Sequence, residues 1–299
     1  MPAALGVRPA GKGHAEQVFI VEAGSGRVLV VEPAAPAPKL AEVTQIELPE
    51  GSQRLCAALL DERTLIVGFG EALRSGRGLR VMRLLDNPSG VTASVRQKSV
   101  SELLPGSVED TLGYYAGLAV NGRYAFTAFR GARGGGRVLR ARHTSGIVSA
   151  FRPLTTTEEF PSAMRLLAIA ASERGYVAAV AEGEGGPRLL FADPDPQRGS
   201  GAPVAMPLNL PGVVAIAYSP VPRPAERRLY ALANGDSTGG LFRIDAGLDA
   251  SGGAVARATR IADLPRATAM AFGGGGVLYI AVEGDAPAKG KLLMLSNDF

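Results

Sequence analysis

Six positions in this chain place a polar or charged side chain at or near the end of an apolar segment. These residues are Glu22, Glu71, Arg130, Glu182, Asn234 and Glu283, with Glu184, Asp236 and Asp285 close behind three of them. Carboxylate and amide oxygens are the ligands that Ca²⁺ prefers in proteins. If the six segments end at one face, these side chains form an acidic rim. We therefore take as candidate ligand-face residues Glu22, Glu71, Arg130, Glu182, Asn234, Asp236 and Glu283. Ordinary loop solvation is the preferred interpretation of these residues, and no cofactor is predicted; a bound calcium ion is the alternative.

A second group is basic and falls within residues 130–145, which we predict to be a long loop. It contains Arg130, Arg133, Arg137, Arg140, Arg142 and His143. Such a cluster can bind phosphates or an acidic partner. Phe129 is the one aromatic residue beside it, so the aromatic interleaving of single-strand binders is missing. A solvated loop is the preferred interpretation; as a binding site, the pattern favours an acidic protein partner over nucleic acid.

Other chemistries lack the residues that they need. Two histidines and one cysteine are too few for a typical zinc site. The segment VGFGEAL, which begins at Val67, has two glycines of a dinucleotide fingerprint but not the third. The segment GDSTGG resembles the nucleophile loop of trypsin-like proteases, but Thr238 is inserted in it and no histidine stands in that family's context. Cys56 lies in the apolar segment LCAALL, where we expect a buried small hydrophobe.

The elements that must position these residues recur along the chain. Short apolar segments precede the candidate residues, and their markers are Phe19, Ile66, Phe126, Val177, Tyr230 and Tyr279, spaced by 47, 60, 51, 53 and 49 residues. A period near 50 with four short strands per unit is typical of propeller blades. The sequence thus predicts an all-β fold, a propeller of six four-stranded antiparallel blades.

Within each unit, the predicted first strand is rich in alanine and glycine, as strands crowded around a propeller axis require. These strands are 3–7, 55–60, 115–120, 164–170, 213–218 and 267–272. The third strands are predicted at 27–31, 79–84, 147–151, 188–192, 241–245 and 291–295. Residues 3–7 open the first blade in the preferred arrangement, which leaves the last blade with three strands. The alternative is that residues 3–7 complete the last blade.

Three segments carry a family resemblance: VFIVEAGSGRVLVVEP, LYALAN followed by GGLFRID, and ALGVRPAGKG. They resemble the repeats of YVTN/NHL-type β-propellers. The resemblance implies a torus of blades that binds ligands at the face carrying the loops between second and third strands. Gluconolactonase-type propellers, which the rim also resembles, hold a divalent ion there with Glu, Asn and Asp. No longer match to their motifs is present, so no catalytic residue is carried over.

Bulk properties bound the function. The chain has 299 residues, 46% hydrophobic and 20% charged, and a net charge of +4, which does not indicate a nucleic-acid binder. We expect one propeller domain over 1–299. No apolar run is long enough to span a membrane, and the N-terminal residues do not resemble a signal peptide. We expect a cytoplasmic protein, or a periplasmic or cell-envelope one if a leader has been removed.

The repeat is clear, whereas the sequence shows no clear group of acid–base or metal-binding residues. The sequence therefore predicts a non-catalytic propeller that serves as a platform for a protein partner. The alternative is a divalent-metal-dependent, lactonase-like hydrolase that works at the central face.

Overall fold

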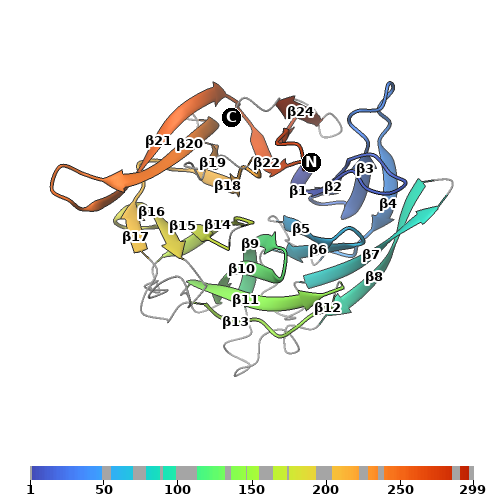
Figure 1. Ribbon diagram of the computed structural model, residues 1–299, viewed down its shortest axis with the longest axis horizontal. Coiled ribbons are helices and arrows are strands. Elements are labelled where there is room, and N and C mark those ends of the chain that lie inside the picture. The colour runs from blue at the N-terminus through green and yellow to red at the C-terminus, as the bar shows by residue number, and fades with distance from the viewer. Residues whose placement is uncertain are drawn as a thin grey trace.

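The computed structural model describes residues 2–48, 55–69, 79–87, 90–98, 113–131, 136–145, 147–154, 164–173, 175–192, 204–221, 228–234, 239–284 and 290–295. Within these ranges the regular secondary structure is entirely β, in six antiparallel sheets arranged around a central axis (Figure 1). The fold is a six-bladed β-propeller, as the sequence predicts. None of the described elements is a helix that could cross a membrane.

The first strand of each blade lies next to the axis, because each contacts the first strands of both neighbouring blades. These inner strands are β1 (Pro2–Arg8), β5 (Leu55–Asp61), β9 (Gly113–Asn121), β14 (Arg165–Ala171), β18 (Val213–Tyr218) and β22 (Ala267–Phe272). The second strands are β2 (Gln17–Glu22), β6 (Thr64–Phe69), β10 (Tyr124–Gly131), β15 (Val177–Gly183), β19 (Leu229–Ala233) and β23 (Leu278–Val282).

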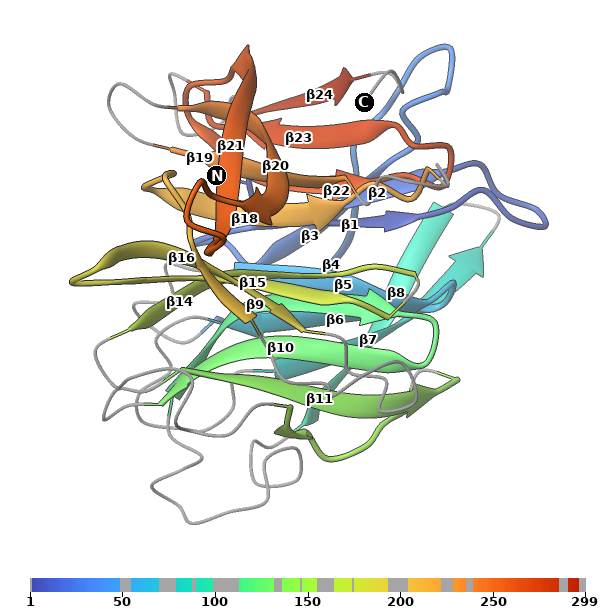
Figure 2. The same cartoon turned by 60° about the vertical axis from the view of Figure 1, so that its left-hand side comes forward.

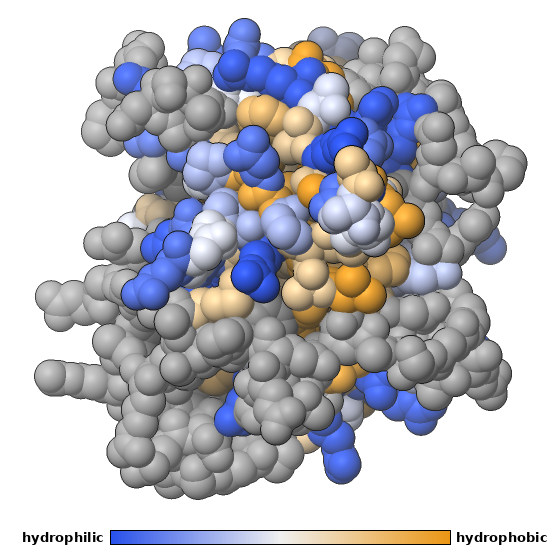
Figure 3. Space-filling model, turned by 90° about the vertical axis from the view of Figure 1, so that its left-hand side faces the viewer, coloured by the Kyte–Doolittle hydropathy of each residue, from blue (hydrophilic) through white to orange (hydrophobic). Residues whose placement is uncertain are grey.

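The third and outer strands complete the blades (Figure 2). The third strands are β3 (Arg27–Val31), β7 (Leu79–Asn87), β11 (Gly136–Thr144), β16 (Gly186–Ala192), β20 (Gly240–Leu248) and β24 (Lys291–Leu295). The outer strands are β4 (Ala41–Gln45), β8 (Gly90–Lys98), β12 (Ile147–Val148), β13 (Arg152–Pro153), β17 (Val204–Pro207) and β21 (Ala254–Asp263). On the flank shown in Figure 3, the described residues mix hydrophilic and apolar side chains, as expected for half-exposed outer strands.

One predicted strand is wrong. The third strand of blade 3 is β11 and not 147–151, which supplies only the short strand β12 and the residues that follow it. The sequence placed 136–144 in a loop because its arginines interrupt the apolar pattern. An outer part of a blade is half exposed, so alternating Val, Leu and Ala are enough to hold such a strand.

The preferred arrangement of the chain ends is confirmed. β1 pairs with β2 in blade 1, and the described part of blade 6 is the three-stranded sheet β22–β23–β24. Blades 1 and 6 therefore meet by packing and not by sharing a sheet. Glu16 joins them: the Tyr279 hydroxyl donates to its carboxylate at 2.6 Å, and the Gly274 amide donates at 2.9 Å.

The hydrophobic core is divided among the blade interfaces. The buried apolar residues that the structure describes form six clusters, one between each pair of neighbouring blades. Second strands are apolar on both faces because each face packs on a different neighbour. The aromatic residues at one repeated position, Phe19, Phe126, Tyr230 and Tyr279, are all buried and serve this packing, as predicted.

Candidate active site in the central channel

The inner strands enclose a cavity on the propeller axis with a volume of about 850 Å³. Each inner strand contributes a residue with a minimal side chain at one equivalent level: Gly6, Ala58, Ala119, Ala170, Ala217 and Ala271. Larger side chains at this level would fill the axis. In five blades the small residue pairs across the sheet with a large marker residue of the second strand. The small residues of the repeat therefore also leave the space that forms the channel.

The described lining runs from mid-strand to the ends of the inner strands. It includes the turns after three of these strands, at Ser172–Glu173, Ser219–Val221 and Gly273–Gly274. We call this the C-end of the channel, because the inner strands finish here. The opposite end, where the inner strands begin and the second strands finish, is the N-end. The antiparallel register fixes this geometry, for example by pairing Arg165 with Glu182 at the N-end.

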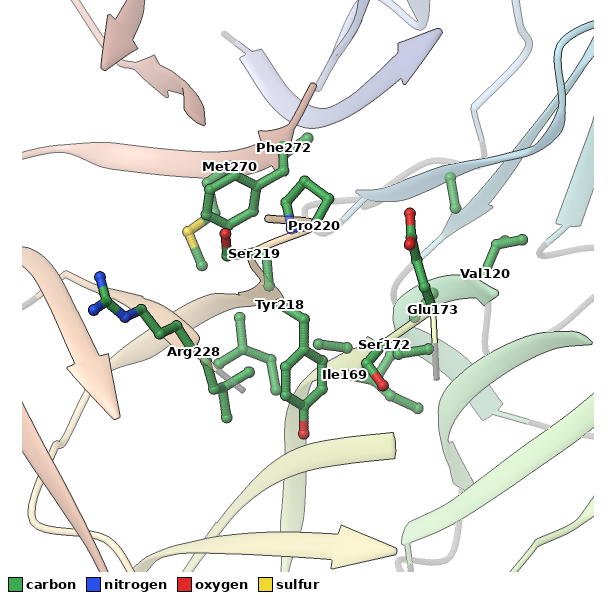
Figure 4. Close-up of a pocket in the computed structure, with 18 of the residues that line it drawn as sticks. Val120, Ile169, Ser172, Glu173, Tyr218, Ser219, Pro220, Arg228, Met270 and Phe272 are labelled. Carbon is green, nitrogen blue, oxygen red and sulfur yellow. The ribbon is translucent and has the colours of Figure 1, made fainter. Parts of the chain in front are cut away.

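Polar side chains gather at the C-end within an otherwise apolar wall. Figure 4 shows Ser172 and Glu173 on one side of the cavity, and Ser219 beside Met270 and Phe272 on another. The two serines serve their own turns: the Ser172 hydroxyl accepts the Tyr176 amide at 3.0 Å, and the Ser219 hydroxyl accepts the Val221 amide at 3.3 Å. Among the described residues, neither serine has a positioned base, so neither shows the arrangement of an activated nucleophile there.

Two carboxylates are found among the described residues that line the cavity, Glu173 and Asp245. Asp245 is paired with Arg243 at 3.0 Å. Glu173 is exposed and, in the part of the chain that the structure describes, takes part in no hydrogen bond or ion pair. Glu173 is therefore the carboxylate of the C-end that remains available to a bound molecule. Arg228 and Tyr218 line the same cavity and supply N–H and O–H donors.

The predicted ligand-face residues lie at the N-end, but two of their carboxylates already form ion pairs with arginines. Glu22 accepts hydrogen bonds from Ser25 at 2.9 Å and from Arg27 at 2.8 Å. Burial raises the pKa of Glu22, but the bonds from Arg27 and Ser25 outweigh it and hold the pKa below its ordinary value. Glu182 is paired with Arg165 at 3.1 Å. Both carboxylates are thus already neutralised.

The remaining ligand-face candidates do not complete a metal site. The backbone amide of Asn234 donates to the Gly212 carbonyl oxygen, and that of Glu283 donates to the Arg266 carbonyl oxygen. Arg130 belongs to β10, but its side chain, like Glu71 and Asp236, lies outside the described residues. Within the described ranges, no three His, Cys, Asp or Glu side chains come together as metal ligands. The described donor set therefore does not fit the divalent ion that the family resemblance implies.

The predicted basic loop is a strand over most of its length. Arg137, Arg140, Arg142 and His143 lie in β11, whereas Arg133 falls outside the described residues. His143 is buried, and its Nε2 atom finds no hydrogen-bond partner among the described atoms. Burial lowers the pKa of His143, partly opposed by Asp61. His143 is therefore a neutral core residue at neutral pH and does not belong to the basic surface.

Cys56 is half-buried against the core between blades 2 and 3, where we predicted a buried residue. Its thiol lies 3.7 Å from the Gly68 carbonyl oxygen and 3.8 Å from that of Tyr115. Burial raises the pKa of the Cys56 thiol to about 12, so the nucleophilic thiolate is scarce at neutral pH.

Solved structures with the same fold come from several functional classes. No family model and no curated protein sequence matches the chain. The periplasmic gluconolactonase of Pseudomonas aeruginosa aligns with a TM-score of 0.54 and 17% identity, over 99% of this chain and 84% of that one. A gluconolactonase of Xanthomonas campestris aligns with a TM-score of 0.55 and 11% identity, over 93% and 82%. TolB of Acinetobacter baumannii aligns with a TM-score of 0.54 and 12% identity, over 94% and 61%.

At these identities the likeness shows the fold. It also corrects the prediction of a non-catalytic platform, because the neighbours that span this chain include gluconolactonases. The repeat pattern gave no sign of Glu173, because it follows a first strand and the predicted site lay at the ends of second strands. A polar Ser172–Glu173 pair directly after an apolar inner strand was the available signal.

Proposed function

We propose that this protein is a lactonase-like hydrolase that opens cyclic esters in the C-end of its central channel. The observation that carries the proposal is the cavity itself. At about 850 Å³ it lies within the range of small-molecule sites, and both apolar and polar residues line its wall. The gluconolactonases with this fold support the same assignment.

The residues at the C-end suit ester hydrolysis in the following roles. Glu173 takes a proton from a water molecule whose oxygen attacks the lactone carbonyl carbon. Donors from Tyr218 and Arg228 stabilise the negative charge that develops on the carbonyl oxygen. The ring C–O bond then breaks, and the proton held by Glu173 passes to the leaving alkoxide. The product is an open-chain hydroxy acid, and every step uses side chains of this chain.

Glucono-δ-lactone is the probe for this activity, with acid release followed by a pH indicator against buffer alone. Ala217 lies in the channel wall, so Ala217→Trp fills the cavity and we expect at least a tenfold fall in kcat/KM. The matched control is Val204→Trp, because Val204 is 46% exposed on outer strand β17. The control is expected to keep wild-type activity. Hydrolysis no faster than in buffer, or full activity in a folded Ala217→Trp protein, would refute the proposal.

A further inference from the structure

The cavity is not symmetric around the propeller axis. In blades 1, 2, 3 and 6, the described residues that line it belong to the inner strand or to the turn after it. In blades 4 and 5 the lining also reaches the outer half of the blade, at β16, β19 and β20. The cavity therefore extends outwards between these two blades. We call this extension the side arm, and the residues that define it are Leu189, Phe191, Leu229, Ile244 and Ala246.

The order of the strands places the side arm at the C-end of the channel. Third strands run from the N-end to the C-end, and Phe191 and Ala246 lie close to the ends of β16 and β20. Tyr218, at the end of β18, packs against the same interface, and Figure 4 shows its ring directed away from Met270 of blade 6. The side arm is therefore continuous with the part of the cavity that Glu173 lines.

Apolar side chains of both blades form the walls of the side arm. Leu189, Leu229 and Ile244 are at most 4% exposed and belong to the hydrophobic cluster between blades 4 and 5. Phe191 is partly buried, and its ring stacks on that of Tyr176 with 5.4 Å between the centroids and 18° between the planes. This stacking holds the Phe191 ring in a fixed orientation, so the apolar wall is formed before any ligand binds.

The charged residues of β20 lie on the other side of the strand. Arg243 pairs across the sheet with Tyr230, which is buried in the cluster between blades 5 and 6. Side chains alternate along a strand, so Arg243 and Asp245 project away from the face that carries Ile244 and Ala246. They also form an ion pair with each other at 3.0 Å. The face of β20 that borders the side arm is therefore apolar.

The shape of the side arm suits a slender group. Two facing sheets pack about 10 Å apart, and the distance from a first to a third strand is also about 10 Å, comparable to an extended heptyl chain. We propose that the side arm binds an unbranched alkyl chain carried by the lactone ring, so that alkyl-substituted lactones are the preferred substrates. This assignment rests on the proposed function, because it places the ring beside Glu173 and the chain between blades 4 and 5. Each methylene group buried there should raise the affinity about fourfold.

Lactams test this binding without turnover, because they keep the ring and the carbonyl group of a lactone but resist hydrolysis. Isothermal titration calorimetry compares δ-valerolactam with its heptyl derivative, which carries the chain on the ring carbon next to the nitrogen. We expect the wild-type protein to bind the heptyl lactam at least about a hundredfold more tightly. Ala246→Trp places a large side chain at the exposed end of the side arm and should reduce this ratio to less than about tenfold. The matched control Ala41→Trp, at an exposed position of outer strand β4, should keep the wild-type ratio.

Three outcomes would overturn the proposal: equal affinities of the wild-type protein for the two lactams, an unchanged ratio in a folded Ala246→Trp protein, or tighter binding of the polyhydroxylated glucono-δ-lactam than of the heptyl lactam. If Ala246→Trp does not fold, Phe191→Ala takes its place, because it removes one wall of the side arm and should also lower the ratio.

This proposal and the proposed function fail in different ways. A protein that prefers the heptyl lactam but hydrolyses no lactone has the side arm without the catalytic activity. A protein that hydrolyses glucono-δ-lactone but binds the two lactams equally has the catalytic activity, and the side arm then binds no alkyl chain.

Discussion

The two ends of the channel use carboxylates in opposite ways. At the N-end, Glu22 and Glu182 are each bound by an arginine of their own blade. At the C-end, Glu173 lines the cavity without such a partner in the described structure, and the buried Arg8 pairs with Asp86 of the neighbouring blade. The comparison teaches that a carboxylate at a strand end marks a site only if its charge is not already satisfied.

The largest effect is expected from breaking the ion pair that joins blades 1 and 2 at the C-end. Arg8 is buried and binds Asp86 of the neighbouring blade through two hydrogen bonds, at 2.7 and 2.8 Å, while Gln17 accepts a third at 3.0 Å. Asp86→Ala leaves the buried Arg8 guanidinium without its counter-charge, and because Asp86 itself is 49% exposed we expect a loss of about 2 kcal/mol in unfolding free energy. Urea denaturation measures the loss.

Asp245→Ala is the control for this prediction, because its pair with Arg243 is about half exposed. The control should cost less than about 0.5 kcal/mol. If Asp86→Ala and Asp245→Ala lose similar unfolding free energy, the burial of Arg8 does not make its ion pair stronger than the exposed one.

The same pair predicts a pH dependence. The hydrogen bonds from Arg8 outweigh burial and hold the pKa of Asp86 below its ordinary value of 3.8. A carboxyl group whose pKa is lowered by folding stabilises the folded state above its unfolded pKa, and this stabilisation is lost as the pH falls through the folded value. The stability difference between wild type and Asp86→Ala should therefore stay constant at higher pH and shrink below about pH 4. A difference that grows on acidification would contradict this assignment.

At the N-end, the tight turn after β2 depends on backbone conformation. Gly26 has a φ of 68°, and an added Cβ atom would collide with the carbonyl oxygen of Ile46. Gly24 in the same turn has a φ of 82° but open space around the Cβ position. We expect Gly26→Ala to cost about 2 kcal/mol and Gly24→Ala about 1 kcal/mol, since only the first adds a collision to the strain. If thermal unfolding gives the same stability loss for both variants, the collision with Ile46 does not contribute to the cost of Gly26→Ala.

The contact that joins blades 1 and 6 should have a smaller effect. Tyr279→Phe removes the hydroxyl that donates to Glu16 and should cost about 1 kcal/mol, the usual net value of one hydrogen bond. Burial and the Glu16 carboxylate both raise the pKa of Tyr279, so its hydroxyl remains a donor throughout the neutral range. Glu16→Gln keeps an acceptor oxygen and should cost less than Tyr279→Phe, which urea denaturation of both variants can check.

Sequence periodicity predicted most of the fold because propeller blades repeat one burial pattern. The spacing of Phe19 to Tyr279 placed six second strands, and small residues such as Ala170 and Ala217 identified the inner strands. It failed at β11, where Arg137, Arg140 and Arg142 masked the strand.

The site was harder to predict than the fold, because it depends on partners that no spacing reveals. Arg165 and Glu182 lie 17 residues apart and meet only through the register of β14 and β15. The available carboxylate, Glu173, follows an inner strand at the end of the channel that the repeat does not mark.

The most direct test compares Glu173→Gln and Glu182→Gln in hydrolysis of glucono-δ-lactone, since each substitution removes one carboxylate from one end of the channel. If the C-end is the active site, Glu173→Gln should lower kcat about a hundredfold, the usual contribution of a general base. Glu182→Gln should stay within about twofold of wild type. A large loss in Glu182→Gln, with Glu173→Gln fully active, would move the reaction to the N-end and contradict the account.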